Sequence, residues 1–227
     1  MNRQLALVAV FAVGLPSVVF AQGRPRFQVG PVAHIDKVSI EGGAGGSVFA
    51  AGAGAELRIF RGFGIEAEIT QASGDIGRSY EGWFVSFNQD RNATRAEIEA
   101  LAPTARRALG YAPGLGGATA LVFRGQARGR VTMAARGGFS WRRYEDTSDF
   151  TVLTIPDGID PAGVAPYFTD STASRTRGGL LLGFDAAIAL TDRISIAPEV
   201  RFVYSGPAQV GNKYREFGFG TRAMWRF

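Results

Sequence analysis

The last fifteen residues, Lys213 to Phe227, read KYREFGFGTRAMWRF and alternate between two kinds of side chain. From Phe227 back to Phe217, every second residue is aromatic, alanine or threonine, and the residues from Arg226 back to Glu216 between them are charged, glycine or methionine. Successive side chains of a β-strand point to opposite faces of the sheet, so a repeat of two residues indicates a strand. This segment is predicted to be a strand with one apolar face and one polar face.

The same alternation recurs along the chain and predicts eight strands separated by turn-forming residues. Their expected ranges are 27–40, 48–60, 63–70, 117–125, 130–144, 178–190, 193–204 and 213–227. At one end the connections are all short, namely Arg61–Gly62, Gln126–Gly129 and Thr191–Arg193. At the other end they are a glycine turn (Gly42–Gly46), two long insertions (about 71–115 and 145–175) and a modest loop (205–212).

The two long insertions are expected to be loops. In the first, Thr94 and Glu97 have the spacing of a capping box, which predicts a short helix. The apolar residues of that helix would be Ile98, Leu101, Ala105 and Leu109. The second insertion is rich in Asp, Pro and Gly, as surface loops often are.

Residues 1–21 are predicted to be a cleaved signal peptide. Arg3 supplies a positive start, and Leu5 to Leu15 is an apolar run too short for a membrane-spanning helix. Val19 and Ala21 are small residues at the positions that signal peptidases require. The exported domain is then 22–227, and without cysteine it carries neither a disulfide nor a lipid anchor at its N-terminus.

No later apolar run approaches the length of a spanning helix, so a membrane-embedded form of this domain must be a closed barrel. In that form the apolar faces meet lipid and the charged faces meet a narrow interior. The basic residues are scattered and form no stripe, which argues against a nucleic-acid partner. The fold class expected is an all-β, eight-stranded, antiparallel up-and-down transmembrane β-barrel, with short periplasmic turns and two long extracellular loops.

By this pattern the chain resembles the small eight-stranded outer-membrane barrels, the class of the OmpA transmembrane domain and OmpX. The resemblance covers residues 27–227, and its most specific part is the terminal MWRF. It implies a location in the bacterial outer membrane, with outer-membrane lipids and lipopolysaccharide as partners, and a monomeric state. It further implies that Trp225 and Phe227 form the signal by which the barrel assembly machinery recognises this protein.

Charged residues on the polar faces are expected to fill the interior, because an eight-stranded barrel is just wide enough for its own side chains. Buried charges must be paired, so a mixed ionic network is predicted to plug the lumen. Its expected members are Glu56, Arg58, Glu66, Glu68, Arg136, Arg142, Asp185, Glu199, Arg201, Glu216, Arg222 and Arg226.

Any binding function is expected on the long loops. Trp83, Phe84 and Phe87 are candidate contacts for lipopolysaccharide or another partner, as against simple loop packing. The aspartates of the second insertion (Asp146, Asp149, Asp157, Asp160 and Asp170) could attract divalent cations, as against lying in solvent. Aromatic residues near strand ends are expected to form girdles at the membrane surfaces, namely Phe63, Trp141, Tyr144, Tyr204, Trp225 and Phe227.

No catalytic site, cofactor or metal centre is expected. The chain has a single histidine, His34, which shares a face with Asp36 but has no evident serine partner, so an interior hydrogen-bonding role is favoured. The leading hypothesis is a non-catalytic barrel with a structural or surface-interaction role. Two alternatives remain open: a narrow channel for small solutes or ions, and a soluble, lipocalin-like binder with the apolar faces inside.

Overall fold

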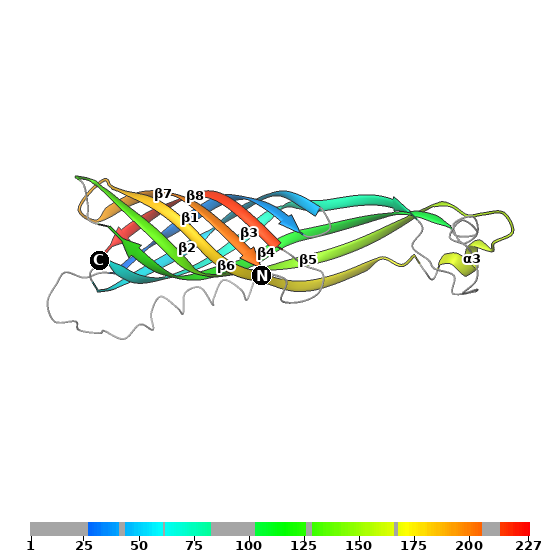
Figure 1. Cartoon of the computed structure of the whole chain (residues 1–227), viewed down its shortest axis with the longest axis horizontal. Helices are drawn as coiled ribbons and strands as arrows, with labels where there is room; N and C mark the ends of the chain where they lie inside the picture. The colour runs from blue at the N-terminus through cyan, green and yellow to red at the C-terminus, as the bar shows by residue number, and fades with distance from the viewer. Residues whose placement is uncertain are drawn as a thin grey trace, which may run out of the picture.

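The computed structural model describes residues 27–40, 44–60, 62–82, 103–125, 129–165, 168–205 and 214–227. The predicted signal peptide lies outside these residues. Eight strands form one closed barrel in which each strand pairs antiparallel with the next, and the last pairs with the first (Figure 1). The strands are β1 (Phe27–Ile40), β2 (Ala44–Phe60), β3 (Phe63–Gly82), β4 (Thr104–Arg124), β5 (Val131–Thr154), β6 (Ser171–Ala189), β7 (Ile194–Ser205) and β8 (Tyr214–Arg226). The eight-stranded, up-and-down topology predicted from the alternation is therefore confirmed.

The ring closes between the two ends of the domain. Val29 of β1 pairs with Trp225 of β8, and Ile40 pairs with Tyr214. Beyond the last pair, the backbone N–H of Phe227 donates to the carbonyl of Phe27 at 3.0 Å. We call this end of the barrel, which also holds the short connections, the turn end, and the opposite end the loop end.

The short connections at the turn end are built from local turn chemistry. Gly62 has φ +92°, a conformation that favours glycine. A Cβ at this position would also meet the carbonyl oxygen of Arg124, whose N–H donates to the Gly62 carbonyl at 2.8 Å. At the β6–β7 turn, the Thr191 hydroxyl accepts from the N–H groups of Arg193 and Ile194 at 3.2 and 3.0 Å.

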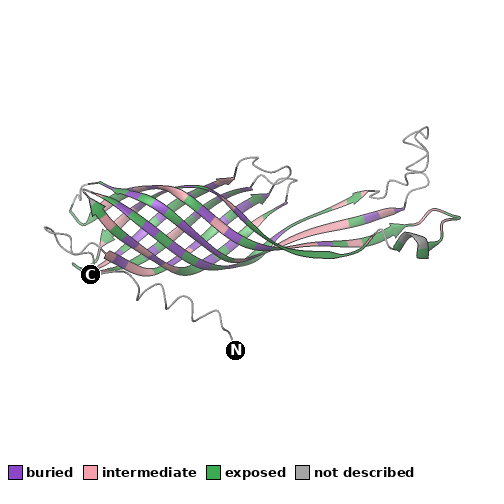
Figure 2. Cartoon of the chain, turned by 90° about the horizontal axis from the view of Figure 1, so that it is seen from below, coloured by how far each residue is buried: buried purple, intermediate pink, exposed green. Residues whose placement is uncertain are grey.

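Burial alternates along the barrel strands, as the coloured bands of Figure 2 show. Large apolar side chains face outward around the barrel; Leu121, Leu180 and Phe184 are each exposed by about two thirds. Charged residues alternate with them and are buried inside. This arrangement is the inverse of a soluble barrel and is that of a transmembrane one. The soluble, lipocalin-like alternative needs the apolar rows inside and is therefore wrong.

The expectation that 71–115 and 145–175 are loops is wrong over much of both ranges. Strands β3 and β4 continue through 71–82 and 104–115, and β5 and β6 continue through 145–154 and 171–175. Residues 76–82, 104–113, 145–154 and 171–177 of these strands form a four-stranded antiparallel sheet that projects beyond the barrel (Figure 1). We call this sheet the extension. The rest of the first insertion, 83–102, lies outside the described residues.

The predicted helix is wrong for its second half, since Ala105 and Leu109 lie in β4 and pair with Val152 and Ser148 of β5. Its first half, from Thr94 to Leu101, is outside the described part of the chain. This segment forms a strand because β3 and β5 provide backbone hydrogen-bond partners on both of its sides. The helical spacing of its own apolar residues gives no information about those partners. Likewise Ala44 to Gly46, expected in a glycine turn, already belong to β2.

Register shifts mark the place where the sheet leaves the barrel. They fall between Gln71 and Ile76 of β3 and between Pro113 and Gly116 of β4. Such irregularities bend a strand locally and increase its twist. Near the tip of the extension lies one short helix, α3 (Pro161–Val164). No helix among the described residues is long and apolar enough to cross a membrane.

Candidate functional site: the barrel interior and the strand extension

The structure brings the residues predicted for the interior together inside the barrel. Ten of the twelve are buried, and Arg58 and Arg226 are partly buried. Arg124, Asp36 and His34 join them. We call the paired residues the ionic network: Asp36, Glu56, Glu66, Glu68, Asp185, Glu199, Glu216, Arg124, Arg136, Arg142, Arg201 and Arg222, with Arg58 at its edge and His34 at its centre.

Near the turn end, the network is anchored by Arg124, which bridges two strands. Its Nε donates to Glu56 at 2.8 Å, and one terminal nitrogen donates to Asp185 at 3.1 Å. Asp185 also binds Arg136, whose guanidinium reaches Glu199 at 2.7 Å. Each carboxylate at this level therefore faces at least one arginine from another strand.

In the middle of the barrel, Arg222 holds three carboxylates. Its nitrogens lie 2.8 Å from Glu66 and 2.9 Å from Glu68, and a third ion pair joins it to Glu199. Glu66 is also 3.4 Å from Arg136. These contacts join β3, β5, β7 and β8 across the lumen.

Closer to the loop end, Arg201 has the largest set of partners. Its guanidinium donates to Asp36 at 3.1 and 2.7 Å, to Glu68 at 3.1 Å and to Glu216 at 2.6 Å. Arg142 supplies a second cation, 3.2 Å from Asp36 and 3.4 Å from Glu216. The two arginines thus share two carboxylates.

Glycines on the inner faces make room for these side chains. A Cβ added at Gly183 would lie 2.8 Å from the Arg136 side chain, and one at Gly218 would collide with the Asp36 carboxylate. The small residues therefore decide where the long arginines can pack.

His34 is buried at the centre of the network and has the interior hydrogen-bonding role that the sequence favours. Its Nε2 is 2.9 Å from Glu68 and 2.8 Å from Arg201. His34, Glu68 and Glu199 have metal-ligating atoms within 4.8 Å of one another, and they are the one such group of three in the described part of the chain. Arg201 and Arg222 occupy the same carboxylates, so their positive charge disfavours a cation there.

Toward the loop end the interior becomes apolar, a feature that the sequence reasoning missed. Val38, Ile40, Val48, Ile76 and Val203 are almost fully buried and pack around Tyr144 and Tyr214. The two tyrosine hydroxyls are 2.9 Å apart, and that of Tyr214 also donates to Glu216. The apolar cluster therefore lies on the ionic network and is joined to it by a hydrogen bond.

Tyr144 was expected in an outer girdle, and this expectation is wrong. Its position in β5 has the parity of Arg142, so it points inward and is fully buried. Three other residues of the predicted girdle lie near the turn end, face outward and are more than one third exposed: Phe63, Trp225 and Phe227. The candidate contacts Trp83, Phe84 and Phe87 lie outside the described residues.

The two faces of the extension differ in charge. One face, defined by residues that pair directly across its strands, carries Arg78, Arg107, Arg175 and Arg177 against a single acid, Asp146. The opposite face carries Arg106 against Glu81, Glu145 and Asp149, with Arg143 at its base. We call the first the cationic face.

Aromatic rings hold the arginines of the cationic face. Arg107 lies over the Phe150 ring at 5.2 Å and donates to the Ser148 hydroxyl at 2.8 Å. Arg177 lies 5.2 Å from the Tyr111 ring and donates to Asp146 at 2.6 Å. Burial raises the pKa of Asp146, and the nearby Arg177 and Arg175 oppose that rise.

Three of the five aspartates of the second insertion have partners within the protein. Asp146 pairs with Arg177, Asp160 accepts from the Ala162 N–H at 3.0 Å, and Asp170 accepts from the Phe150 N–H at 2.8 Å. Within the described residues, these aspartates contribute to no group of three metal-ligating side chains. The attraction of divalent cations by these aspartates, as against a solvated loop, stays a prediction.

Comparison with known proteins gives the fold. No family model matches the sequence, and no curated protein matches it. Among solved structures, Neisserial surface protein A is similar with a TM-score of 0.51 at 14% identity, over 91% of this chain and 100% of that one. OprG from Pseudomonas aeruginosa gives 0.47 at 9% identity, over 91% and 98%. Ail of Yersinia pestis gives 0.42 at 12% identity, over 89% and 100%.

At these identities the likeness concerns the fold alone. The predicted resemblance to small eight-stranded outer-membrane barrels is thereby confirmed at the level of architecture. The chain has the fold of an eight-stranded transmembrane β-barrel, closed between its first and last strands.

Proposed function

We propose that this protein is a non-catalytic barrel of the bacterial outer membrane, which displays the extension as an interaction surface and keeps its lumen closed. Outer-membrane lipids and lipopolysaccharide would surround a monomeric barrel, after cleavage of residues 1–21. The turn end would face the periplasm and the extension would face the exterior. Barrels of this class have their short turns on the periplasmic side of the membrane. Trp225 on the last strand and Phe227 directly after it are both exposed, and the barrel assembly machinery would recognise them.

The observation that carries the proposal is the difference between the barrel and the extension, which are two parts of the same sheet. Inside the barrel, arginines and carboxylates form ion pairs with one another across the lumen, and an apolar cluster lies above them. A path for ions would have to break several buried ion pairs, each of which costs a few kcal/mol. Outside the barrel, four of the same strands continue into solvent with polar and charged surfaces, where they have no part in closing the ring.

The first experiment tests the barrel and the closed lumen. Outer-membrane fractions of cells that express the full chain are run unheated and boiled on detergent gels. A compact, faster unheated band in that fraction is expected. The purified protein is then incorporated into planar bilayers, where no steady conductance is expected. A soluble periplasmic protein without a mobility shift would refute the location, and a steady salt-dependent conductance would favour the narrow-channel alternative.

The second experiment tests the extension. Its cationic face suits an anionic partner, so the probe is labelled dextran sulfate, with neutral dextran for comparison. Arg78→Gln/Arg175→Gln removes two exposed arginines from the cationic face, and Arg106→Gln/Arg143→Gln removes two from the opposite side. Binding of dextran sulfate should fall in the first variant and persist in the second. Equal loss in both variants, or equal binding of neutral dextran, would refute a face-specific role.

A further inference from the structure

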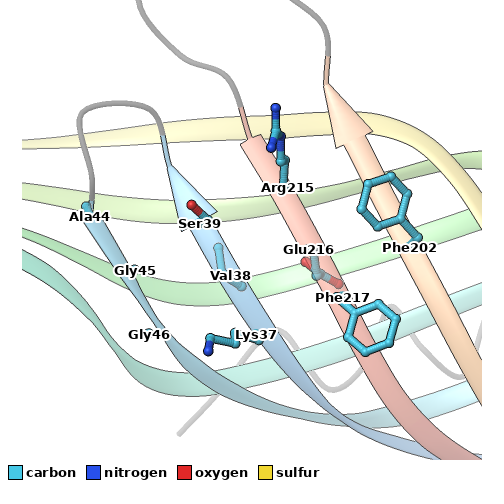
Figure 3. Close-up of a pocket in the computed structure, with 10 residues that line it drawn as sticks. All are labelled: Lys37, Val38, Ser39, Ala44, Gly45, Gly46, Phe202, Arg215, Glu216 and Phe217. Carbon is cyan, nitrogen blue, oxygen red and sulfur yellow. The ribbon is translucent and has the colours of Figure 1, made fainter.

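A groove of about 390 Å³ lies on the outer surface near the loop end, where β1, β2, β7 and β8 come together (Figure 3). Its outward-facing lining combines cations, a hydroxyl and aromatic rings: Lys37, Ser39, Gly45, Phe202, Arg215 and Phe217. Four inward-facing residues, Val38, Ala44, Gly46 and Glu216, also line the groove, and Glu216 belongs to the ionic network. The groove lies outside the extension, and its outward-facing residues belong neither to the ionic network nor to the cationic face.

The strand register explains the order of these residues down the wall. Residues paired directly across antiparallel strands share a face. The uppermost row runs Gly45, Ser39, Arg215 and Tyr204, and the next runs Ser47, Lys37, Phe217 and Phe202. The row below is wholly apolar: Phe49, Ile35, Phe219 and Val200. Polar groups thus lie directly above an aromatic wall.

The hollow results from an abrupt change in side-chain size along these rows. β2 contributes only Ala44, Gly45 and Gly46, while β7 and β8 contribute the larger Phe202 and Phe217. In Figure 3, Lys37 extends toward the glycines of β2, and Arg215 projects toward the loop end above Phe202 and Phe217. The space is bounded by β1 and β8, which hold the two cations, and by Gly45 and Gly46 of β2, which have no side chains.

Neither cation is neutralised within the described part of the chain. Lys37 and Arg215 form no ion pair there, and Arg215 contacts the Tyr204 ring at 5.8 Å. The carboxylate on the same row, Asp75, pairs with Ser47 and is therefore two strands from Lys37, about 10 Å away. A cation on a lipid-facing wall is unfavourable unless its long side chain reaches the polar headgroups.

We propose that this groove binds the headgroup of a phosphate-bearing, anionic lipid; this inference rests on the proposed membrane location. The phosphate oxygens accept hydrogen bonds from the Lys37 amine, the Arg215 guanidinium and the Ser39 hydroxyl. An acyl chain of the same lipid lies along Phe217 and Phe219, the apolar column directly below. The site thereby fixes the height at which the outer leaflet meets the barrel.

The test uses the full folded protein in a neutral detergent, titrated with dioleoylphosphatidylglycerol and followed by native mass spectrometry. Dioleoylglycerol, which lacks the phosphate, and glycerol 3-phosphate, which lacks the acyl chains, separate the two halves of the ligand. The test variant is Lys37→Gln/Arg215→Gln. The matched control is Arg130→Gln/Arg193→Gln, which removes two exposed arginines at the turn end. Every protein is first checked for the unheated gel shift.

Each cation near a lipid surface contributes about fivefold to binding, so the test variant should bind the phospholipid about 30-fold more weakly than the native chain. The control should bind as the native chain does, and neither partial ligand should compete. An unchanged affinity in the test variant, or an equal loss in the control, overturns the proposal. Competition by glycerol 3-phosphate would make the groove a phosphate site without a lipid. A native chain that shows the gel shift but binds no phospholipid refutes the site alone, whereas a missing gel shift refutes the membrane location as well.

Discussion

Replacing Arg201 by methionine should destabilise the barrel more than any surface substitution. The Arg201 side chain is only 4% exposed and contacts Asp36, Glu68 and Glu216. Methionine keeps an unbranched apolar stem but has no guanidinium group, so the substitution leaves three buried carboxylates with one cation fewer. Each keeps a second arginine: Arg142 for Asp36 and Glu216, and Arg222 for Glu68.

Removal of one partner from a buried ion pair costs about 3–5 kcal/mol. Because each carboxylate keeps another arginine, the three losses should not add, and the total is expected to stay within that range. The matched control is Arg106→Met on the extension, where Arg106 pairs with Glu81 and both side chains are about half exposed. An exposed pair contributes about 0–1 kcal/mol.

The free energy of unfolding can be measured by urea titration of protein folded in lipid vesicles, with tryptophan fluorescence and gel mobility as two independent signals. Coincidence of the two signals would support a two-state analysis. The Asp36→Asn variant and the Asp36→Asn/Arg201→Met double variant complete a cycle that isolates the coupling between these two residues. A loss below about 1 kcal/mol for Arg201→Met, or a loss equal to that of Arg106→Met, would refute the view that the interior depends on this arginine.

Three further predictions concern other parts of the fold. Tyr144→Phe removes the hydroxyl that contacts Tyr214 at 2.9 Å and should lower the free energy of unfolding by about 1 kcal/mol in the same urea titration; no change would mean that the hydroxyl pair is irrelevant to stability. Gly138→Ala should sharply reduce the fraction of protein that shows the unheated gel shift, because its Cβ would collide with the backbone of β4. The neighbouring control, Gly137→Ala, places a Cβ 3.9 Å from a single side-chain carbon and should fold normally. Equal yields of folded protein would refute the packing argument. Phe227→Ala should lower the amount of barrel assembled in the outer membrane of cells but not the folding of purified protein into vesicles, and an unaffected cellular yield would exclude a role in recognition.

The barrel could be predicted because the pattern that specifies each strand lies within that strand's own sequence. A period of two is readable in each strand, and the short connections at one end fix the direction of every strand. The parity of Glu56, Arg136 and Arg222 relative to their apolar neighbours was sufficient to place them on the inner face. The same parity places Arg124 and Asp36 on the inner face, and it excludes Tyr144 from the outer girdle.

The extension could not be predicted in the same way. Its strands contain Gly110, Pro113 and many short polar residues, which individually favour turns. They are strands because neighbouring segments pair with them, and pairing between distant segments leaves little trace in one sequence. The apolar cluster at the loop end was missed for a related reason. Alanines and valines such as Ala72 and Val203 lie on inner faces between charged positions, and only closure of the ring brings them together.

The height of the extension has a consequence for any encounter at the cell surface. From Glu145 to Thr154, β5 continues for ten residues beyond the barrel wall, which at about 3.3 Å for each residue gives a reach of about 33 Å. In the proposed orientation, a partner would meet the tip of this sheet well before it reaches the lipid. Because the reach is made of hydrogen-bonded strands, little chain entropy is lost when contact is made. The same interstrand hydrogen bonds would transmit a pull on the tip directly to the barrel wall.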